Sequence, residues 1–173
     1  MKYLSRTILV LIISTLGLFQ SCKQKAETTS NEKQNQVVEK ESSNLDFIFP
    51  KGQKGPDKFF TGNAYNTGLV AMDSTYTTLV GNVYFEPGAR SNWHTHPGGQ
   101  ILIITDGVGY HQLEGEPIQI MKKGDVVKCP PNKRHWHGAS PNQGLQQMYI
   151  VPNTEKGIVN WMEAVTDEQY NNL

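Results

Sequence analysis

Cysteine is nearly absent from this chain of 173 residues, which contains only Cys22 and Cys129. If Cys22 carries a lipid, Cys129 has no partner, and no intrachain disulfide is predicted. Cys129 ends the strand-like run at residues 126–129, where a free cysteine behaves as a small buried hydrophobe. The fold must therefore be stabilised by a hydrophobic core, for which a single domain of this length is sufficient.

The chain also has no excess of charge of either sign, with 16 basic and 16 acidic residues. Proteins that bind nucleic acid through its phosphates usually carry a clear basic surplus. We therefore predict no nucleic-acid partner. Residues 1–21 hold two basic residues and no acidic ones, so the rest of the chain has 14 basic and 16 acidic residues, a net charge of −2.

Long hydrophobic runs are scarce, and the clearest is ILVLIISTLGLF at residues 8–19. This run is shorter than the roughly 20 apolar residues of a membrane-spanning helix, and it follows Lys2 and Arg6, so residues 1–21 are predicted to be a signal peptide. A small residue followed by Cys22, directly after the run, resembles the cleavage site of bacterial lipoproteins. Cys22 is then the site of lipid attachment, and the protein is expected in the bacterial cell envelope, anchored to a membrane only through this lipid. An ordinary secretory signal with an incidental cysteine is the alternative.

Residues 22–44 contain almost no large apolar side chains and show no amphipathic period. Such a segment cannot bury enough apolar surface to offset the loss of chain entropy, so we predict a disordered tether. A flexible chain of this length spans roughly 25–30 Å. The folded domain is accordingly predicted at residues 45–173.

From residue 45 onward, short apolar runs alternate with turn residues. The predicted strands are residues 79–85, 100–105, 108–113, 118–121, 126–129 and 145–151. Asp106-Gly107, Glu114-Gly115 and Lys123-Gly124 are predicted to form turns between them. Strands at this spacing leave no room for long helices and indicate an all-β fold, an antiparallel sandwich or barrel. Near the C-terminus, Thr166 and Gln169 have the spacing of a capping box and predict one helical turn.

Four of the five histidines lie in two pairs, in HTH at residues 94–96 and HWH at residues 135–137. In a strand, residues i and i+2 point to the same face, so both histidines of a pair can project together. Gln100 shares this parity if the strand continues through residues 97–99. A second strand that brings His135 opposite would complete a site of three nitrogens and one oxygen. That donor set suits Mn, Fe, Co, Ni or Zn.

Two motifs make this interpretation more specific. The pattern G-x5-HTH-x3-Q-x6-G over residues 88–107 matches the spacing of the first motif of the cupin superfamily, with Gln in place of the usual Glu. The pattern G-x5-PPN-x2-H over residues 124–135 resembles the second motif, with Asn132 in place of Gly, and asparagine tolerates a positive φ better than most residues. The resemblance implies an antiparallel double-stranded β-helix, the cupin barrel or jelly roll. It also implies one divalent transition metal bound by His94, His96, Gln100 and His135.

The chain resembles a group of small single-domain cupins that includes the manganese-dependent (R)-mandelonitrile lyases, and it also resembles quercetin-dioxygenase-like cupins. The similarity extends over about residues 60–170 and is carried by FTG at 60–62, FEPGAR at 85–90, GDVV at 124–127 and HWHGAS at 135–140. It implies three histidines and one glutamine as ligands and favours manganese, with Fe, Ni, Co or Zn as alternatives. Members often have a histidine twelve residues after the last ligand. This chain has Gln147 there, which weakens the transfer of cyanohydrin chemistry.

The predicted ligand set is neutral and leaves two positions of an octahedral ion open for substrate. A centre that keeps its +2 charge favours Lewis-acid chemistry, so we expect a lyase acting on small hydroxy or carbonyl compounds, similar to hydroxynitrile lyases. Two alternatives remain open. One is a dioxygenase of a small aromatic or enol substrate, and the other is a non-catalytic module that binds a small ligand.

The remaining candidate residues follow from their positions near these motifs. His137 shares the face of His135 and is the candidate catalytic residue, with a hydrogen-bonded core histidine as the alternative. Arg90, Tyr84 and Gln147 are candidates for the substrate pocket, and His111 is interpreted as structural. A small molecule is the expected substrate, and the protein is expected to form a homodimer or a higher homo-oligomer.

Overall fold

The computed structural model describes residues 45–173. The predicted signal peptide, the lipid site at Cys22 and the tether lie outside the described residues, so those expectations stay predictions. Within residues 45–173, no helix is both long enough and apolar enough to cross a membrane.

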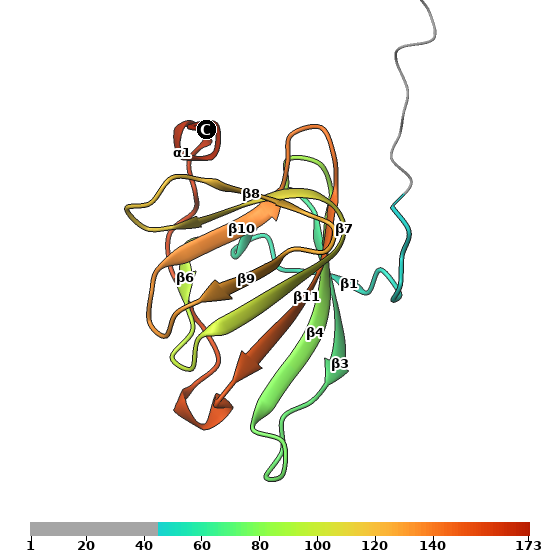
Figure 1. The fold of residues 1–173 in the computed structure, drawn as a ribbon, viewed down its shortest axis with the longest axis vertical. Coiled ribbons are helices and arrows are strands. Elements are labelled where there is room, and N and C mark those ends of the chain that lie inside the picture. The colour runs from blue at the N-terminus through green and yellow to red at the C-terminus, as the bar shows by residue number, and fades with distance from the viewer. Residues whose placement is uncertain (1–44) are drawn as a thin grey trace, which may run out of the picture. The chain divides into compact units, whose positions relative to one another are not determined.

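Antiparallel strands make up nearly all of the regular structure, which curls into a half-barrel (Figure 1). One sheet contains β1 (Gln53–Lys54), β3 (Ala64–Val70), β4 (Thr78–Phe85), β11 (Leu145–Pro152), β7 (Gln100–Leu113) and β9 (Val126–Cys129). The other contains β2 (Phe60–Thr61), β5 (Arg90–Ser91), β6 (His94–Thr95), β8 (Gln119–Lys122), β10 (His135–Ala139) and β12 (Asn160–Trp161), and it also includes β7. The predicted all-β antiparallel fold class is confirmed.

Strand β7 joins the two sheets and corrects one prediction. The sequence predicts a turn at Asp106-Gly107 between two strands, but residues 100–113 form one continuous strand. Its first half pairs with β9 and β11, and its second half pairs with β8 and β10. Gly107 has a φ of 83°, and the pairing with β11 skips Thr105, because Gln146 pairs with Asp106 and Gln147 pairs with Ile104. The strand therefore bends at a β-bulge at Thr105, two residues before the positive-φ glycine, and continues instead of ending.

The strands form because their residues alternate between core and solvent. In β9, Val127 and Cys129 are buried whereas Val126 and Lys128 are exposed, which confirms the prediction of a buried cysteine. The main core cluster lies between the curled walls and includes Phe85, Leu102 and Met121. Strand β3 was not predicted, because its burial alternates only between half-buried and exposed residues after Ala64.

A second cluster packs the C-terminal segment against β10. Trp93, Tyr110 and Trp136 form this cluster with Val165 and Tyr170, so the two tryptophans pack in the protein interior. Neither tryptophan lines the cavity that contains His94, His96 and His137, which is described below. Short helices η1 (Thr154–Lys156) and α1 (Asp167–Tyr170) complete the segment. The predicted capping box at α1 is present, with both of its hydrogen bonds between Thr166 and Gln169.

Tyr170 fastens this segment through one buried hydrogen bond, from its hydroxyl to the carbonyl of Ala139 at 2.7 Å. Replacing Tyr170 with Phe leaves that carbonyl without its partner, and we expect the free energy of unfolding to fall by about 1–2 kcal/mol. Chemical denaturation measures the loss. Tyr76→Phe is the matched control, because Tyr76 is 63% exposed and should change stability by less than about 0.5 kcal/mol. Equal losses of stability in the two variants would contradict the stabilising role of the hydrogen bond from Tyr170 to Ala139.

Candidate metal centre

Three strands and one loop bring the four predicted ligands to one place inside the barrel. His94 lies in β6 and is paired directly with His135, the first residue of β10. Gln100 is the first residue of β7, and His96 lies in the loop between β6 and β7. The ring centroids of His94 and His135 are 4.3 Å apart, and those of His96 and His135 are 5.6 Å apart.

The turn that precedes β10 helps to place His96. Asn132 has a φ of 60°, so the left-handed conformation expected for this asparagine is confirmed. Its backbone N–H donates to the carbonyl of His96 at 2.9 Å. The second motif thus fixes the backbone of a ligand from the first motif.

Each of the three candidate histidine ligands has its Nδ1 held by a backbone carbonyl. His94 Nδ1 lies 2.9 Å from the carbonyl of Asn92, and His135 Nδ1 lies 2.9 Å from that of Lys133. His96 Nδ1 lies 2.5 Å from the carbonyl of Ile158. A carbonyl can only accept, so each ring carries its proton on Nδ1 and has a free lone pair on Nε2. This is the usual way in which proteins orient metal-binding imidazoles.

The Nε2 atoms are placed where a cation would satisfy them. His96 Nε2 is buried without any hydrogen-bond partner. His135 Nε2 lies 3.2 Å from Gln100 Oε1, and both atoms are acceptors when the His135 proton is on Nδ1. Two facing acceptors repel each other, whereas a cation between them is bound by both. The residues therefore fit a divalent metal ion.

Burial keeps these imidazoles neutral, which is the form that binds metal. It lowers the pKa of His94 well below its ordinary value, with further lowering from neighbouring His135. Burial also lowers the pKa of His96 and lowers that of His135 to about 3. At neutral pH the protons therefore do not compete with a metal ion for Nε2.

His137 gives a second, overlapping set of possible ligands. Ligand atoms of His94, His135 and His137 all lie within 4.8 Å of one another. However, Gln147 Nε2 donates to His137 Nδ1 at 2.8 Å, so the ring proton of His137 is on Nε2, opposite to the other three rings. His137 thus offers an N–H where the others offer a lone pair, and the motif-based set with His96 and Gln100 fits an ion better.

The structure places the other candidate residues as follows. Gln147 is buried beside His137, as part of the histidine cluster. Arg90 instead donates to the carbonyl of Val165 and to Asp167, so we assign it to fastening the C-terminal segment. Tyr84 packs edge-on against Phe47, on the sheet face opposite the core residue Phe85.

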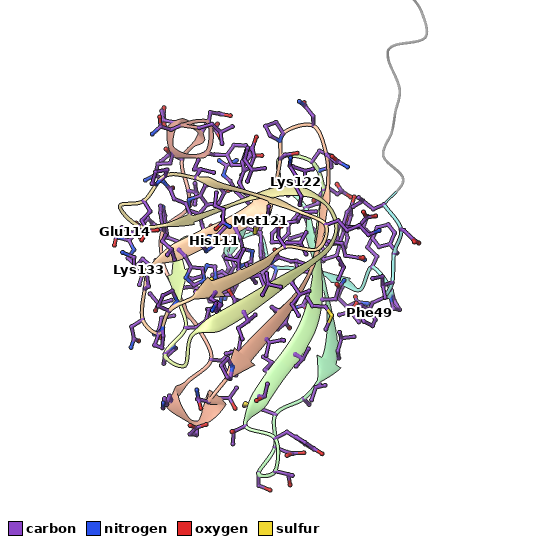
Figure 2. The ribbon with its side chains drawn as sticks, viewed as in Figure 1. Phe49, His111, Glu114, Met121, Lys122 and Lys133 are labelled. Carbon is purple, nitrogen blue, oxygen red and sulfur yellow. The ribbon has the colours of Figure 1, made fainter. Side chains whose placement is uncertain are left out.

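His111 lies in the interior between strands (Figure 2), with its Nε2 3.3 Å from Cys129 Sγ. Burial raises the pKa of the Cys129 thiol to about 12 and lowers that of His111 to about 4, so both groups are neutral. This pair agrees with the structural role predicted for His111.

A cavity of about 170 Å³ reaches the histidines, and sequence reasoning missed most of its wall. Apart from the histidines and Gln100, the wall is mainly apolar and comes from β2, β3, β4, β11 and the segment after η1. The alternation of Gln147, Tyr149 and Val151 along β11 could have indicated part of it. The lining residues are Phe60, Asn66, Leu79, Val83, His94, His96, Gln100, His137, Tyr149, Val151, Ile158, Val159 and Trp161.

Comparison with known proteins agrees with this architecture. Residues 81–150 match the cupin domain. The chain is 44% identical over 117 residues to an (R)-mandelonitrile lyase of Granulicella tundricola, which covers 68% of this chain and 89% of the relative. A cupin-like protein of Thermotoga maritima has a TM-score of 0.70 and 50% identity, over 72% of this chain and 95% of that one. A DMSP lyase of Ruegeria pomeroyi, with a TM-score of 0.53 and 16% identity over 71% of this chain and 62% of that one, shares the fold. The chain therefore belongs to the cupin superfamily.

Proposed function

We propose that this protein is a metal-dependent lyase that cleaves small hydroxynitriles or related hydroxy and carbonyl compounds. The observation that carries the proposal is the neutral three-histidine, one-glutamine cluster at an apolar cavity, in a chain 44% identical to an (R)-mandelonitrile lyase. The donor set of imidazole nitrogens and one amide oxygen suits Mn, Fe, Co, Ni or Zn. Manganese is the proposed ion because the chain resembles the manganese-dependent (R)-mandelonitrile lyases. When bound by His94, His96, Gln100 and His135, it would supply Lewis-acid polarisation of a substrate oxygen.

The residues of the cavity provide the rest of the chemistry. Apolar side chains such as Phe60 and Trp161 bind the organic part of the substrate and exclude water. Cleavage of a hydroxynitrile removes the hydroxyl proton, breaks the bond between the carbinol carbon and cyanide, and delivers a proton to cyanide. His137 is buried and neutral, and its Nε2–H is available while Gln147 donates to Nδ1. The Nε2–H of His137 is therefore proposed to hydrogen-bond to the leaving cyanide and stabilise its negative charge, and the proton lost from the hydroxyl group is the one that cyanide takes up.

Mandelonitrile cleavage tests the proposal. Protein loaded with manganese should release benzaldehyde, measured by its absorbance, and protein treated with a chelator should not. Oxygen uptake is followed in the same samples and should stay at background. Oxygen consumption without benzaldehyde release would favour the dioxygenase alternative, and metal-dependent binding without turnover would favour a binding module.

We also propose that the mature protein is anchored in the cell envelope through a lipid on Cys22. Metabolic labelling with palmitate in a bacterial host should label the chain, and Cys22→Ala should remove the label completely. Cys129→Ala is the matched control and should keep it, because Cys129 is buried in the folded domain. An unlabelled, released wild-type product would rule out the anchor.

A further inference from the structure

One wall of the cavity is formed by an aromatic ring that lies over a glycine. Tyr149 of β11 is paired with Gly81 of β4, which in turn is paired with Gly68 of β3, three strands that lie side by side in Figure 1. A Cβ atom built on Gly81 would collide with the hydroxyl and ring of Tyr149, at 2.7 Å from Cε1. The phenol ring therefore lies flat across β4, in the space that a side chain at residue 81 would fill.

The hydroxyl end of this ring is held at the opening of the cavity. Tyr149 Oη lies 3.3 Å from Asn66 Nδ2 and 3.3 Å from Asn66 Oδ1. Asn66 is exposed, whereas Tyr149 is half-buried, and both line the cavity that reaches the histidine cluster. The ring thus spans from β11 to β3 and forms part of the wall near the cavity entrance.

Space is available beside the ring for it to move. A Cβ atom built on Gly68, on the far side of Gly81 from Tyr149, would have no heavy atom within 4 Å. The ring is held at its tip by long hydrogen bonds to one exposed side chain, which are weaker than bonds of ordinary length. A shift of the phenol toward Gly68 would therefore change the size of the cavity, although the ring also packs against the main core cluster.

The size of the cavity indicates what it can hold. About 150 Å³ is enough for one benzene molecule in an apolar protein cavity, and this cavity measures about 170 Å³. It accommodates one six-membered ring with a small substituent. A fused bicyclic ring system exceeds this volume, so it fits only if the wall moves or if part of the ring system extends out through the opening.

We propose that Tyr149, lying over Gly81 and held by Asn66, is the specificity-determining residue that restricts this protein to substrates with a single ring. The inference rests on the proposed function for the substrate class, because aromatic aldehydes are the carbonyl products of aryl hydroxynitriles. It adds a residue outside the metal cluster that selects among those substrates by size.

Binding of two aldehydes by the manganese-loaded protein tests this role without requiring turnover. Dissociation constants for benzaldehyde and 2-naphthaldehyde are measured by ligand-observed NMR in the absence of cyanide. Tyr149→Ala should shift the ratio of affinities toward 2-naphthaldehyde by about tenfold or more, because the wall that excludes the second ring is removed. Manganese content, measured by elemental analysis, should not change.

Gly81→Ala tests whether the position of the ring sets the limit. The added methyl group pushes the phenol into the cavity, so benzaldehyde should bind about fivefold or more weakly. Gly68→Ala is the matched control, since its methyl group meets open space, and it should leave both dissociation constants unchanged. In the double variant Gly81→Ala/Tyr149→Ala, the loss caused by Gly81→Ala should disappear, because the ring through which it acts is absent.

The outcomes separate this inference from the proposed function. Wild-type protein that binds benzaldehyde in preference to 2-naphthaldehyde but does not cleave mandelonitrile would overturn the lyase proposal and leave the role of Tyr149 intact. An unchanged affinity ratio in Tyr149→Ala, or a Gly81→Ala effect that persists without the Tyr149 ring, would overturn the role of Tyr149 even in an active lyase. Wild-type protein that binds neither aldehyde would overturn it as well.

Discussion

Protein in which His94 and His135 are both replaced by alanine is expected to contain less than about a tenth of an equivalent of metal, against about one equivalent in the wild type. These two residues face each other across β6 and β10 and supply two of the four donors. Loss of an outer partner of a metal ligand typically costs 10–100-fold in affinity, so loss of two direct ligands should exceed about 100-fold. Elemental analysis of protein purified without added metal measures the content. Full retention in the double variant would show that the ion, if any, is bound elsewhere.

Two single substitutions then decide between the overlapping histidine sets. His96→Ala should remove the metal, because the unpartnered Nε2 of His96 is assigned to the ion. His137→Ala should keep it, because the Gln147 amide directs the lone pair of His137 away from a ligand role. The reverse result would assign the ion to His94, His135 and His137, the set with ligand atoms within 4.8 Å of one another. Circular dichroism should confirm that both variants fold.

The sequence was sufficient to predict this cluster because its information is local. His135 and His137 share a face because both lie in β10, whereas His96 lies in the loop after β6, and the spacing of His94, His96, Gln100 and His135 follows two recognisable motifs. Asn132 could be assigned to a left-handed turn for the same reason, since one residue determines the backbone conformation there. The class of the fold followed in the same way from short alternating strands and frequent turn residues.

Features that depend on distant contacts were not predictable from the sequence. Arg90 lies between ligand motifs in the sequence, yet its guanidinium bonds to Val165 and Asp167, about 75 residues away. Tyr84 lies next to the core residue Phe85 but points to the opposite face of β4, where it meets Phe47. The position of Tyr149 over Gly81 depends on the register of β11 against β4, which no local pattern encodes.

Gln100→Glu is expected to tighten metal binding while lowering lyase activity. A carboxylate at residue 100 places a full negative charge where an amide oxygen now lies 3.2 Å from His135 Nε2. Two unit charges 4 Å apart attract by about 4 kcal/mol at an effective dielectric constant of 20. Because desolvation of the carboxylate offsets part of this attraction, we expect a net gain in affinity of about 10–100-fold. Competition with a chelator of known affinity measures it, and Gln100→Leu, which removes the donor, is the matched control and should weaken binding.

The fall in activity follows from the same charge. A divalent ion partly neutralised by a carboxylate polarises a substrate oxygen less, so kcat for hydroxynitrile cleavage should fall even though metal occupancy rises. In a dioxygenase, an added anionic ligand instead favours a higher oxidation state of the metal, so oxygen-dependent turnover should hold or increase.

The carboxylate would also raise the pKa of His135 in the metal-free protein, because it stabilises the protonated ring. Protons then compete with metal for this site as the pH falls, so the gain in affinity should shrink below neutral pH. If neither affinity nor turnover changes, Gln100 is not a ligand, and the metal is bound by the three histidines alone.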